Sequence, residues 1–292
     1  MKVNLNIMTQ SFPRIWKLRG KKILIKFGGN SLNGNGDLER ISNDIALLVS
    51  LGLRPIVVHG GGPNISKEME ARGLEVKKVA GLRITDDEAI NVVKDVLSKI
   101  NDQIVDALKA TGVKAIGISG SEGKTVICEK KSPVEVEENG AKLKVDLGNV
   151  GEVKCIDPTT VSVLCASGFV PVIYPICVDP SGREMNVNAD TVAAHLARAL
   201  GCEEMVLVTD VPGVMREIGN LDTIITDITI AEMDHLIEVG IVSGGMLPKV
   251  EACRLAIENG VKKAHMVNGR EPNSILNQVL MGTNCGTTVT IN

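Results

Sequence analysis

The sequence has few aromatic residues and no excess of charge of either sign. One Trp, one Tyr and three Phe among 292 residues amount to 2%, so we expect no aromatic platform for stacking nucleic-acid bases. Lys and Arg total 32 against 35 Asp and Glu. The chain therefore lacks the excess of basic residues that is typical of proteins that bind nucleic acids or membrane surfaces. No apolar run approaches the roughly 18 residues of a membrane span. We therefore expect neither nucleic acid nor a membrane as a partner.

Cysteine and histidine are spaced too widely for a disulfide framework or a metal site. The seven cysteines are odd in number and form no Cys-x-x-Cys, which is typical of reduced thiols in a cytosolic protein. The four histidines show no ligand spacing, so we expect no metal held by protein side chains. The basic N-terminal segment also lacks the apolar block of an export signal. These features predict a cytoplasmic protein.

Short β-branched runs alternate with longer stretches of helical period, which predicts a mostly parallel sheet with helices on both faces. The expected strands include 22–27, 54–59, 114–119, 170–174 and 205–209, and the expected helices include 37–51, 86–111, 189–200 and 246–259. Between 124 and 154 the pattern changes to short strands, and Asn139-Gly140 predicts a hairpin turn. Two lobes are expected to meet between residues 175 and 190.

Two glycine-rich loops follow neighbouring expected strands. Lys26 precedes Gly28 and Gly29, and His59 precedes the run 60–62. A lysine beside exposed backbone N–H groups and a helix start suits phosphate oxygens, and open α/β sheets bind ligands at the carboxyl ends of their strands. Each loop could instead be a turn that needs glycine only for its backbone freedom. His59 fits a packed strand residue better than a base.

Polar residues also precede two of the expected helices. Arg83 stands before the long helix, where its planar fork suits a carboxylate, although a surface arginine at a helix entry is an equally good interpretation. Thr85 or Asp86 is expected to cap that helix. Alternation along an extended segment puts Asn186, Asn188 and Asp190 on one side, which indicates a site. The alternative is that Asn188 or Asp190 caps the helix.

The last third of the chain adds two further segments with polar or small residues at element ends. Thr209 and Asp210 end an expected strand and run into a tight turn. A glycine-rich stretch then leads into a helix that carries Lys249 near its start. This helix start is a second position that would attract phosphate.

The order of these motifs resembles that of the N-acetylglutamate kinases, a branch of the amino acid kinase family. It reads Lys-x-Gly-Gly, His-Gly-Gly-Gly-Pro, Gly-Leu-Arg-x-Thr, Asn-Val-Asn-Ala-Asp, Thr-Asp-Val-Pro-Gly-Val and Gly-Gly-Met-x-x-Lys, from about Gly20 to the C-terminus. Lys-x-Gly-Gly is shared with the aspartate, carbamate and uridylate kinases. Gly-Leu-Arg-x-Thr together with Asn-Val-Asn-Ala-Asp narrows the resemblance to the acetylglutamate branch.

The resemblance implies a three-layer αβα sandwich with a mostly parallel central sheet and two lobes. Residues 1–20 would be an extension with a candidate oligomerisation helix, residues 21–180 would bind the acyl amino acid, and residues 181–292 would bind ATP with Mg²⁺. The implied reaction phosphorylates the side-chain carboxylate of N-acetyl-L-glutamate to N-acetyl-L-glutamyl 5-phosphate, the second step of arginine biosynthesis. The implied partners are small-molecule substrates and further copies of the chain, as a dimer or a hexamer.

The same resemblance assigns roles to individual residues. Lys26 and Lys249 would neutralise the moving phosphoryl group from two sides, and Asp190 would hold both lysines. Arg83 and Asn186 would grip the α-carboxylate. The N–H groups expected to line the transfer path belong to Gly28, Gly29, Gly61 and Gly62. The residues expected to border the nucleotide are Thr209, Asp210, Ser243, Gly244 and Gly245. No general base is required, because the nucleophile is already a carboxylate.

Two alternatives remain open from the residues. The same chemistry could act on a longer acid such as N-acetyl-aminoadipate, because discrimination of one methylene is worth only about 1–3 kcal/mol. A non-catalytic metabolite sensor could retain the fold, although the intact Lys26, Lys249 and Asp190 weigh against it.

The resemblance also bears on inhibition by arginine. Residues 12–21 resemble the end of the helix that joins dimers into a hexamer in the arginine-sensitive members. The chain departs from their pattern at Arg14, where an aromatic is usual, at Gln278, where a glutamate is usual, and at Asn284, where a glycine is usual. We therefore expect inhibition by arginine to be weak or absent, unless another carboxylate such as Glu271 compensates.

Overall fold

The computed structural model of the chain describes residues 5–28, 36–79, 81–138, 141–282 and 285–292. Three of the positions discussed above, Gly29, Asn284 and the Asn139-Gly140 turn, lie outside the described residues. No helix within the described ranges is long and apolar enough to cross a membrane.

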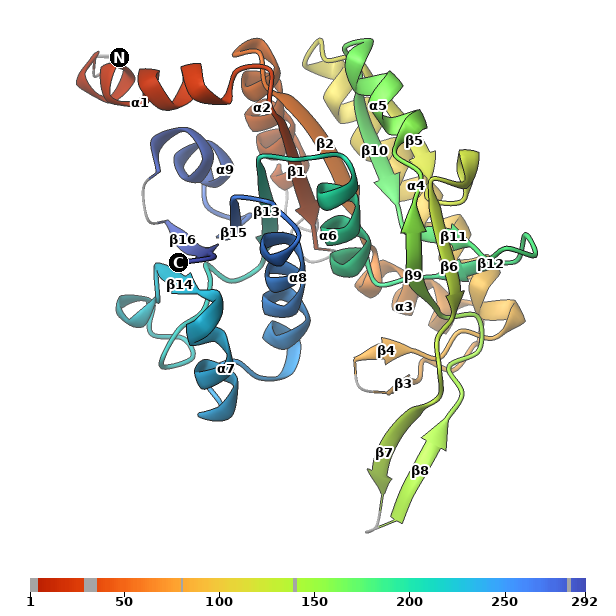
Figure 1. Ribbon diagram of the computed structural model, residues 1–292. Coiled ribbons are helices and arrows are strands. Elements are labelled where there is room, and N and C mark those ends of the chain that lie inside the picture. The colour runs from red at the N-terminus through yellow and green to blue at the C-terminus, as the bar shows by residue number, and fades with distance from the viewer. Residues whose placement is uncertain (1–4, 29–35, 80, 139–140, 283–284) are drawn as a thin grey trace.

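An eight-stranded sheet forms the centre of the molecule (Figure 1). Its strands run in the order β14 (Asp227–Thr229), β16 (Gly286–Thr290), β15 (Lys263–Asn268), β13 (Glu204–Thr209), β1 (Lys22–Phe27), β2 (Arg54–His59), β10 (Val170–Tyr174) and β5 (Ala115–Ser119). The six strands from β15 to β5 are parallel, and β16 is antiparallel to β15. The prediction of a mostly parallel sheet is confirmed.

Helices cover both faces of this sheet, because side chains along each buried strand alternate between two apolar cores. Ile23, Ile25 and Phe27 of β1 belong to the core that includes α2 (Asp37–Ser50), α3 (Gly62–Ala71) and α4 (Asp87–Ala110). Leu24 belongs to the opposite core, with α5 (Thr159–Ala166), α6 (Ala189–Ala199), α7 (Ile230–Glu238) and α8 (Leu247–Glu258). This arrangement confirms the three-layer sandwich. By the same alternation, Lys26 lies on the α6 side.

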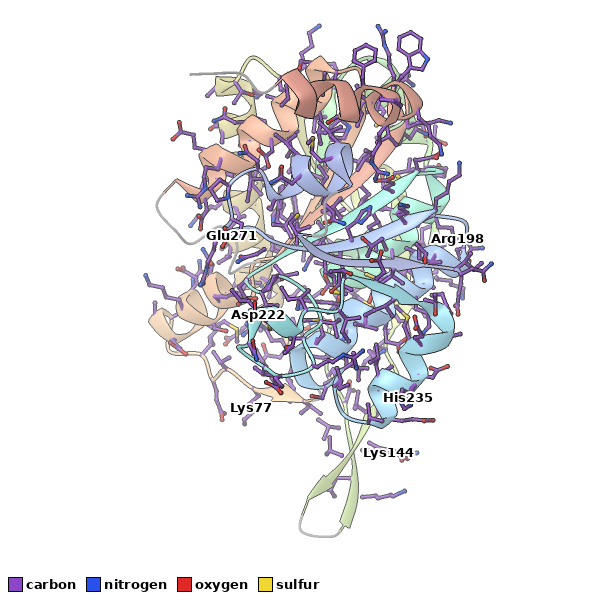
Figure 2. The ribbon with its side chains drawn as sticks, turned by 90° about the vertical axis from the view of Figure 1, so that its left-hand side faces the viewer. Lys77, Lys144, Arg198, Asp222, His235 and Glu271 are labelled. Atoms are coloured by element: carbon purple, nitrogen blue, oxygen red, sulfur yellow. The ribbon has the colours of Figure 1, made fainter. Side chains whose placement is uncertain are left out.

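A second sheet joins β12 (Glu184–Asn186), β11 (Ile176–Val178), β6 (Val126–Lys130) and β9 (Gly151–Ile156). Its strand β12 runs directly towards α6, and so carries Asn186 to the same edge of the central sheet as Lys26. The short hairpin of β3 (Lys78–Val79) and β4 (Leu82–Arg83) lies at this edge. The predicted hairpin around 139–140 is confirmed by β7 (Val134–Glu138) and β8 (Ala141–Val145), which project away from the body, where Figure 2 labels Lys144.

The N-terminal helix α1 (Leu5–Leu18) lies at the opposite end of the sheet from the β3–β4 hairpin (Figure 1). It packs against the π-helical turn Asn277–Met281, which follows the short helix α9 (Ser274–Leu276). Its Arg14 reaches into the molecule, where Nη2 lies 3.0 Å from Oε1 of Glu204 on β13. The helix is therefore tied to the body by an ion pair as well as by packing.

Candidate functional site

The carboxyl ends of β1, β2 and β13 open into a cavity of about 270 Å³, close to the lower end of the range for small-molecule sites. The structure brings most of the predicted site residues to its walls. Those lining it are Lys26, Gly28, Gly61, Gly62, Arg83, Asn186, Asp190, Thr209, Asp210 and Lys249. The predicted residues Ser243, Gly244 and Gly245 are not among the residues that line the cavity.

A buried ion pair joins β1 to α6 beneath the cavity. Nζ of Lys26 lies 2.6 Å from Oδ1 of Asp190, and their side chains are only 7% and 10% exposed. Asn188, not Asp190, caps α6, because its Oδ1 accepts from the backbone N–H groups of Asp190 and Thr191 at 2.8 and 3.2 Å. Asp190 is thus left available to hold the Lys26 ammonium at a fixed position.

Lys249 reaches the cavity from the first turn of α8. Its Nζ donates to the carbonyl of Gly245 at 3.0 Å, one turn earlier in the chain. The expected second link, from Asp190 to Lys249, is not formed between these two described side chains. The structure therefore brings both lysines to one cavity but pairs only Lys26 with the carboxylate.

The two glycine loops extend the sheet by one hydrogen bond each before the chain turns. The N–H of Gly28 donates to Val208 at 3.0 Å, and the N–H of Gly60 donates to Phe27 at 3.1 Å. A Cβ on Gly61 would lie 2.8 Å from Cδ1 of Ile100 on α4, so a side chain at this position would force the end of the Ile100 side chain to move. Gly61 stands just before α3 without a side-chain cap, which leaves the helix start open to an anion.

Arg83 is a buried residue, so the surface interpretation is wrong. Its side chain is held against the start of α3, where Nη2 donates to the carbonyl of Gly62 at 3.0 Å and to Oγ of Ser66 at 2.7 Å. Burial lowers the pKa of this guanidinium. Of the two residues expected to cap α4, Asp86 does so by accepting from two backbone N–H groups.

Asn186 and Thr209 are fixed by contacts close to the cavity. The side-chain amide of Asn186 donates to Oγ1 of Thr85 at 3.4 Å, and that hydroxyl donates to the carbonyl of Arg83 at 3.1 Å. This chain of contacts links the two residues that the resemblance assigns to one carboxylate. The Thr209 hydroxyl bonds to the backbone of Val211, and so closes the turn after β13.

Several residues of the cavity wall were not predicted from the sequence. Lys78 lines it and pairs in register with Arg83 across the β3–β4 hairpin. These strands have only two residues each, too few to show an alternating pattern, so no local signal marks Lys78. The missed apolar wall residues are Ile65, Leu97, Val150 and Pro175.

The charges around the cavity favour an anionic ligand. Four cationic side chains and two carboxylates line it: Lys26, Lys78, Arg83 and Lys249 with Asp190 and Asp210. Backbone N–H groups at the start of α3 add further positive potential. The site can therefore hold negatively charged groups such as carboxylate or phosphate oxygens.

Comparisons with known proteins agree with this chemistry. The sequence profile described as "Amino acid kinase family" matches residues 21–268. The chain is 40% identical to an acetylglutamate kinase of Methanothermobacter thermautotrophicus over 288 residues, 98% of both chains. It is also 40% identical to an acetylglutamate kinase of Methanocaldococcus jannaschii, over 97% of this chain and 95% of that one.

Solved structures share the fold at lower sequence identity. The N-acetylglutamate synthase from Neisseria gonorrhoeae, complexed with coenzyme A and N-acetyl-glutamate, matches 99% of this chain with a TM-score of 0.84 and 22% identity. This chain spans 64% of that synthase. A carbamate kinase from Giardia matches with a TM-score of 0.67 and 16% identity, over 94% of this chain and 99% of that one.

Proposed function

Because the chain belongs to the amino acid kinase family, we propose that it transfers the γ-phosphoryl group of ATP to the side-chain carboxylate of N-acetyl-L-glutamate. The product is N-acetyl-L-glutamyl 5-phosphate, the second intermediate on the route to arginine. The observation that carries the proposal is the buried Lys26–Asp190 pair, which shares a cavity with Arg83 and the open start of α3. Identity of about 40% to acetylglutamate kinases over nearly the whole chain supports the choice of substrate.

In this proposal each lobe binds mainly one of the two substrates. Residues 21–180 bind the acyl amino acid, with Arg83 on its α-carboxylate and the N–H groups of Gly61 and Gly62 near its reacting end. Asn186, from the other lobe, reaches the same α-carboxylate. Residues 181–292 bind ATP, which Thr209 and Asp210 border, together with the stretch 243–245. The placement of Arg83 against the start of α3 supports the first assignment, because it puts the guanidinium and the glycine loop on one wall.

The reaction needs positioning and charge stabilisation rather than a base. The substrate carboxylate attacks the γ-phosphorus, the bond to the β–γ bridging oxygen breaks, and ADP leaves with that oxygen. Lys26 and Lys249 stabilise the negative charge that spreads over the transferring group. Asp190 holds Lys26 in place. Mg²⁺ carried on the nucleotide phosphates would supply further positive charge to the transferring group.

The proposal extends to the setting in which the enzyme works. We infer that it acts as a homo-oligomer in the cytoplasm, on small-molecule substrates. Two large apolar side chains on α1 support self-association, because Phe12 and Trp16 are 62% and 68% exposed. The seven cysteines are all unpaired, which suits a reducing compartment.

A coupled assay of ADP release, with N-acetylglutamate, N-acetyl-aminoadipate and aspartate compared, tests the proposal. We expect ATP turnover that depends on N-acetylglutamate, with hydroxylamine trapping of an acyl phosphate as a second readout. A higher kcat/KM with N-acetyl-aminoadipate would move the activity to the longer acid. Binding of N-acetylglutamate without turnover in the presence of MgATP would identify the chain as a sensor.

A further inference from the structure

His59 is a buried titratable residue beside the cavity that the proposed reaction does not use. It ends β2, it is 0% exposed, and it precedes the glycine loop directly. The expectation that it is a packed strand residue is confirmed. Both of its ring nitrogens nevertheless have polar partners: Nδ1 lies 3.3 Å from the carbonyl oxygen of Gly60, and Nε2 lies 3.1 Å from Nδ2 of Asn101 on α4.

These contacts fix which ring nitrogen carries the proton. Nδ2 of Asn101 also lies 2.9 Å from the carbonyl oxygen of Val172, and a carbonyl oxygen can only accept a hydrogen bond. The Asn101 amide must therefore present its NH₂ group, which gives one hydrogen to Val172 and the other to Nε2 of His59. Nε2 is then an acceptor without a proton, so the single ring proton sits on Nδ1 and is donated to the carbonyl of Gly60.

The surroundings keep this ring neutral and in place. Burial, with a smaller contribution from the positive charge of Lys26, lowers the pKa of His59 to about 4, against the opposing effect of its hydrogen bond to Gly60. On β5, a Cβ at Gly117 would lie 1.8 Å from Oδ1 of Asn101. A glycine in the middle of that strand therefore leaves the space that the Asn101 side chain occupies.

The bond to Gly60 determines the direction of the next backbone N–H. In a trans peptide the C=O and the following N–H point in opposite directions. Because His59 holds the Gly60 carbonyl towards the buried side, the N–H of Gly61 points the other way, towards the cavity that Gly61 lines. No acceptor for this N–H is found among the described residues.

We propose that His59 is a positioning residue: its Nδ1–H holds the Gly60 carbonyl so that the Gly61 N–H is aimed at the transferring phosphoryl group. The inference rests on the proposed function and deepens it. It explains why a neutral histidine, buried between a strand and α4, stands directly before the glycine loop. The loop's amide is thereby oriented before substrate binds, which is the condition for strong transition-state stabilisation.

Two substitutions of His59 test the two hydrogen bonds of the ring one at a time. The amide of His59→Asn can place an N–H where Nδ1 stands, so it keeps the donor to Gly60 and loses the acceptor for Asn101. His59→Gln can place an oxygen where Nε2 stands, so it keeps the acceptor for Asn101 and loses the donor to Gly60. We expect His59→Gln to lower kcat about 10- to 100-fold, with both KM values within about threefold. His59→Asn should keep kcat within about threefold of the wild type.

A matched control is His235→Gln, on the exposed surface of α7 (Figure 2), which should leave kcat unchanged. Wild-type kcat in a folded His59→Gln variant, or an equal loss of kcat in both His59 variants, would overturn the proposal. Nitrogen-15 NMR of the wild type tests the proton assignment without relying on any variant to fold. We expect a neutral ring with the proton on Nδ1 at pH 6, and a proton on Nε2 would overturn it.

The same measurements distinguish failure of this inference from failure of the proposed function. A wild type without acetylglutamate-dependent ADP release would refute the proposed function, whatever the NMR result. A wild type that is active, together with a folded His59→Gln variant of equal kcat, would refute the positioning role alone.

Discussion

Lys26 and Lys249 reach the same cavity in different electrostatic settings. Lys26 is buried against Asp190, whereas Lys249 bonds to a backbone carbonyl near the surface. We expect each alanine variant to lower kcat about 10²- to 10³-fold and to change the KM for N-acetylglutamate less, because the cations stabilise charge that develops in the transition state. Steady-state kinetics with both substrates varied measures this. A variant with near wild-type kcat would remove that lysine from the mechanism.

The two lysine variants should also differ in stability, which thermal unfolding measures. Lys26→Ala leaves the Asp190 carboxylate buried without a partner, at a cost of about 3–5 kcal/mol. Lys249→Ala exposes no buried charge and should change stability by less than about 0.5 kcal/mol. Equal melting temperatures for the two variants would contradict the buried ion pair.

Arg83→Lys should weaken binding of N-acetylglutamate about tenfold and leave ATP affinity within about threefold. Lysine keeps the charge, but its ammonium group lacks the planar set of N–H donors that a guanidinium offers to a carboxylate. It cannot donate to Gly62 and Ser66 and also form a two-point contact with the substrate. Calorimetric titration of each ligand measures the effect. Arg72→Lys, an exposed arginine at the end of α3, is the control and should change neither affinity. Unchanged N-acetylglutamate affinity in Arg83→Lys would exclude a carboxylate contact.

At the residue scale, motif order located most of the cavity walls, and the resemblance paired Asp190 with both lysines, of which the structure shows the pair with Lys26. Lys26, Arg83 and Asp190 were recognisable because each stands beside a strand end or a helix start. The capping of α6 by Asn188 and the pairing of Lys26 with Asp190 depend on side-chain directions, which spacing alone does not fix. Lys78 was missed because its position follows from cross-strand register with Arg83.

Among the elements, α2 and α9 meet through a buried carboxylate. Asp44 of α2 is 6% exposed and accepts hydrogen bonds from the backbone N–H groups of Ile275 and Leu276. Burial raises its pKa to about 6, against the opposing effect of those hydrogen bonds. Because the folded pKa lies above the ordinary value of 3.8, ionised Asp44 destabilises the folded chain above about pH 6. This destabilisation fades as the pH falls from 6 towards 4.

Asp44→Asn should therefore raise the free energy of unfolding at pH 8 by about 1–2 kcal/mol, because the amide oxygen still accepts from the α9 backbone without a buried charge. The gain should shrink as the pH falls from 6 to 4. Urea unfolding at several pH values measures it. Glu39→Gln on the exposed face of α2 is the control and should show no such gain. A variant less stable than the wild type at pH 8 would contradict the raised pKa.

Element prediction succeeded where the periodic segments were long or fully buried. The long helix expected over 86–111 is α4, and the strand expected over 22–27 is β1, because both have continuous apolar patterns. The short β3–β4 hairpin and the π-helical turn at Asn277–Met281 were not predicted. Each is too short for a pattern, and each is stabilised by contacts with distant parts of the chain.

At the scale of the whole molecule, α1 carries a surface suited to self-association. Phe12 and Trp16 are one helical turn apart and both exposed, so their rings share a face. Changing both to serine should lower the mass of the assembly in light scattering and leave kcat within about twofold, because α1 lies far from the cavity. Ile218→Ser, at an exposed apolar residue outside α1, is the control. An unchanged mass in the double variant would exclude α1 from the assembly.

Inhibition by arginine remains predicted to be weak or absent. The chain's own Arg14 bonds to both carboxylate oxygens of Glu204 at 3.0 and 3.2 Å. Gln278, in place of the usual glutamate, donates to Thr288 at 2.8 Å. Gln278 therefore offers a free guanidinium no charge-assisted partner. Initial rates at subsaturating N-acetylglutamate, with arginine titrated, test this. Half-inhibition at submillimolar arginine would contradict the prediction.

The central position of β1 has a consequence for how the chain folds during synthesis. One edge of β1 pairs with β2, which follows it closely in sequence, but the other edge pairs with β13, from Ile23↔Glu204 to Phe27↔Val208. The edge of β1 that faces β13, with its unpaired N–H and C=O groups, stays uncovered until most of the chain has left the ribosome. Contacts between such distant segments form late and slowly, and an open strand edge is a template for aggregation. A fragment of residues 21–180 therefore lacks the strand that completes its own sheet.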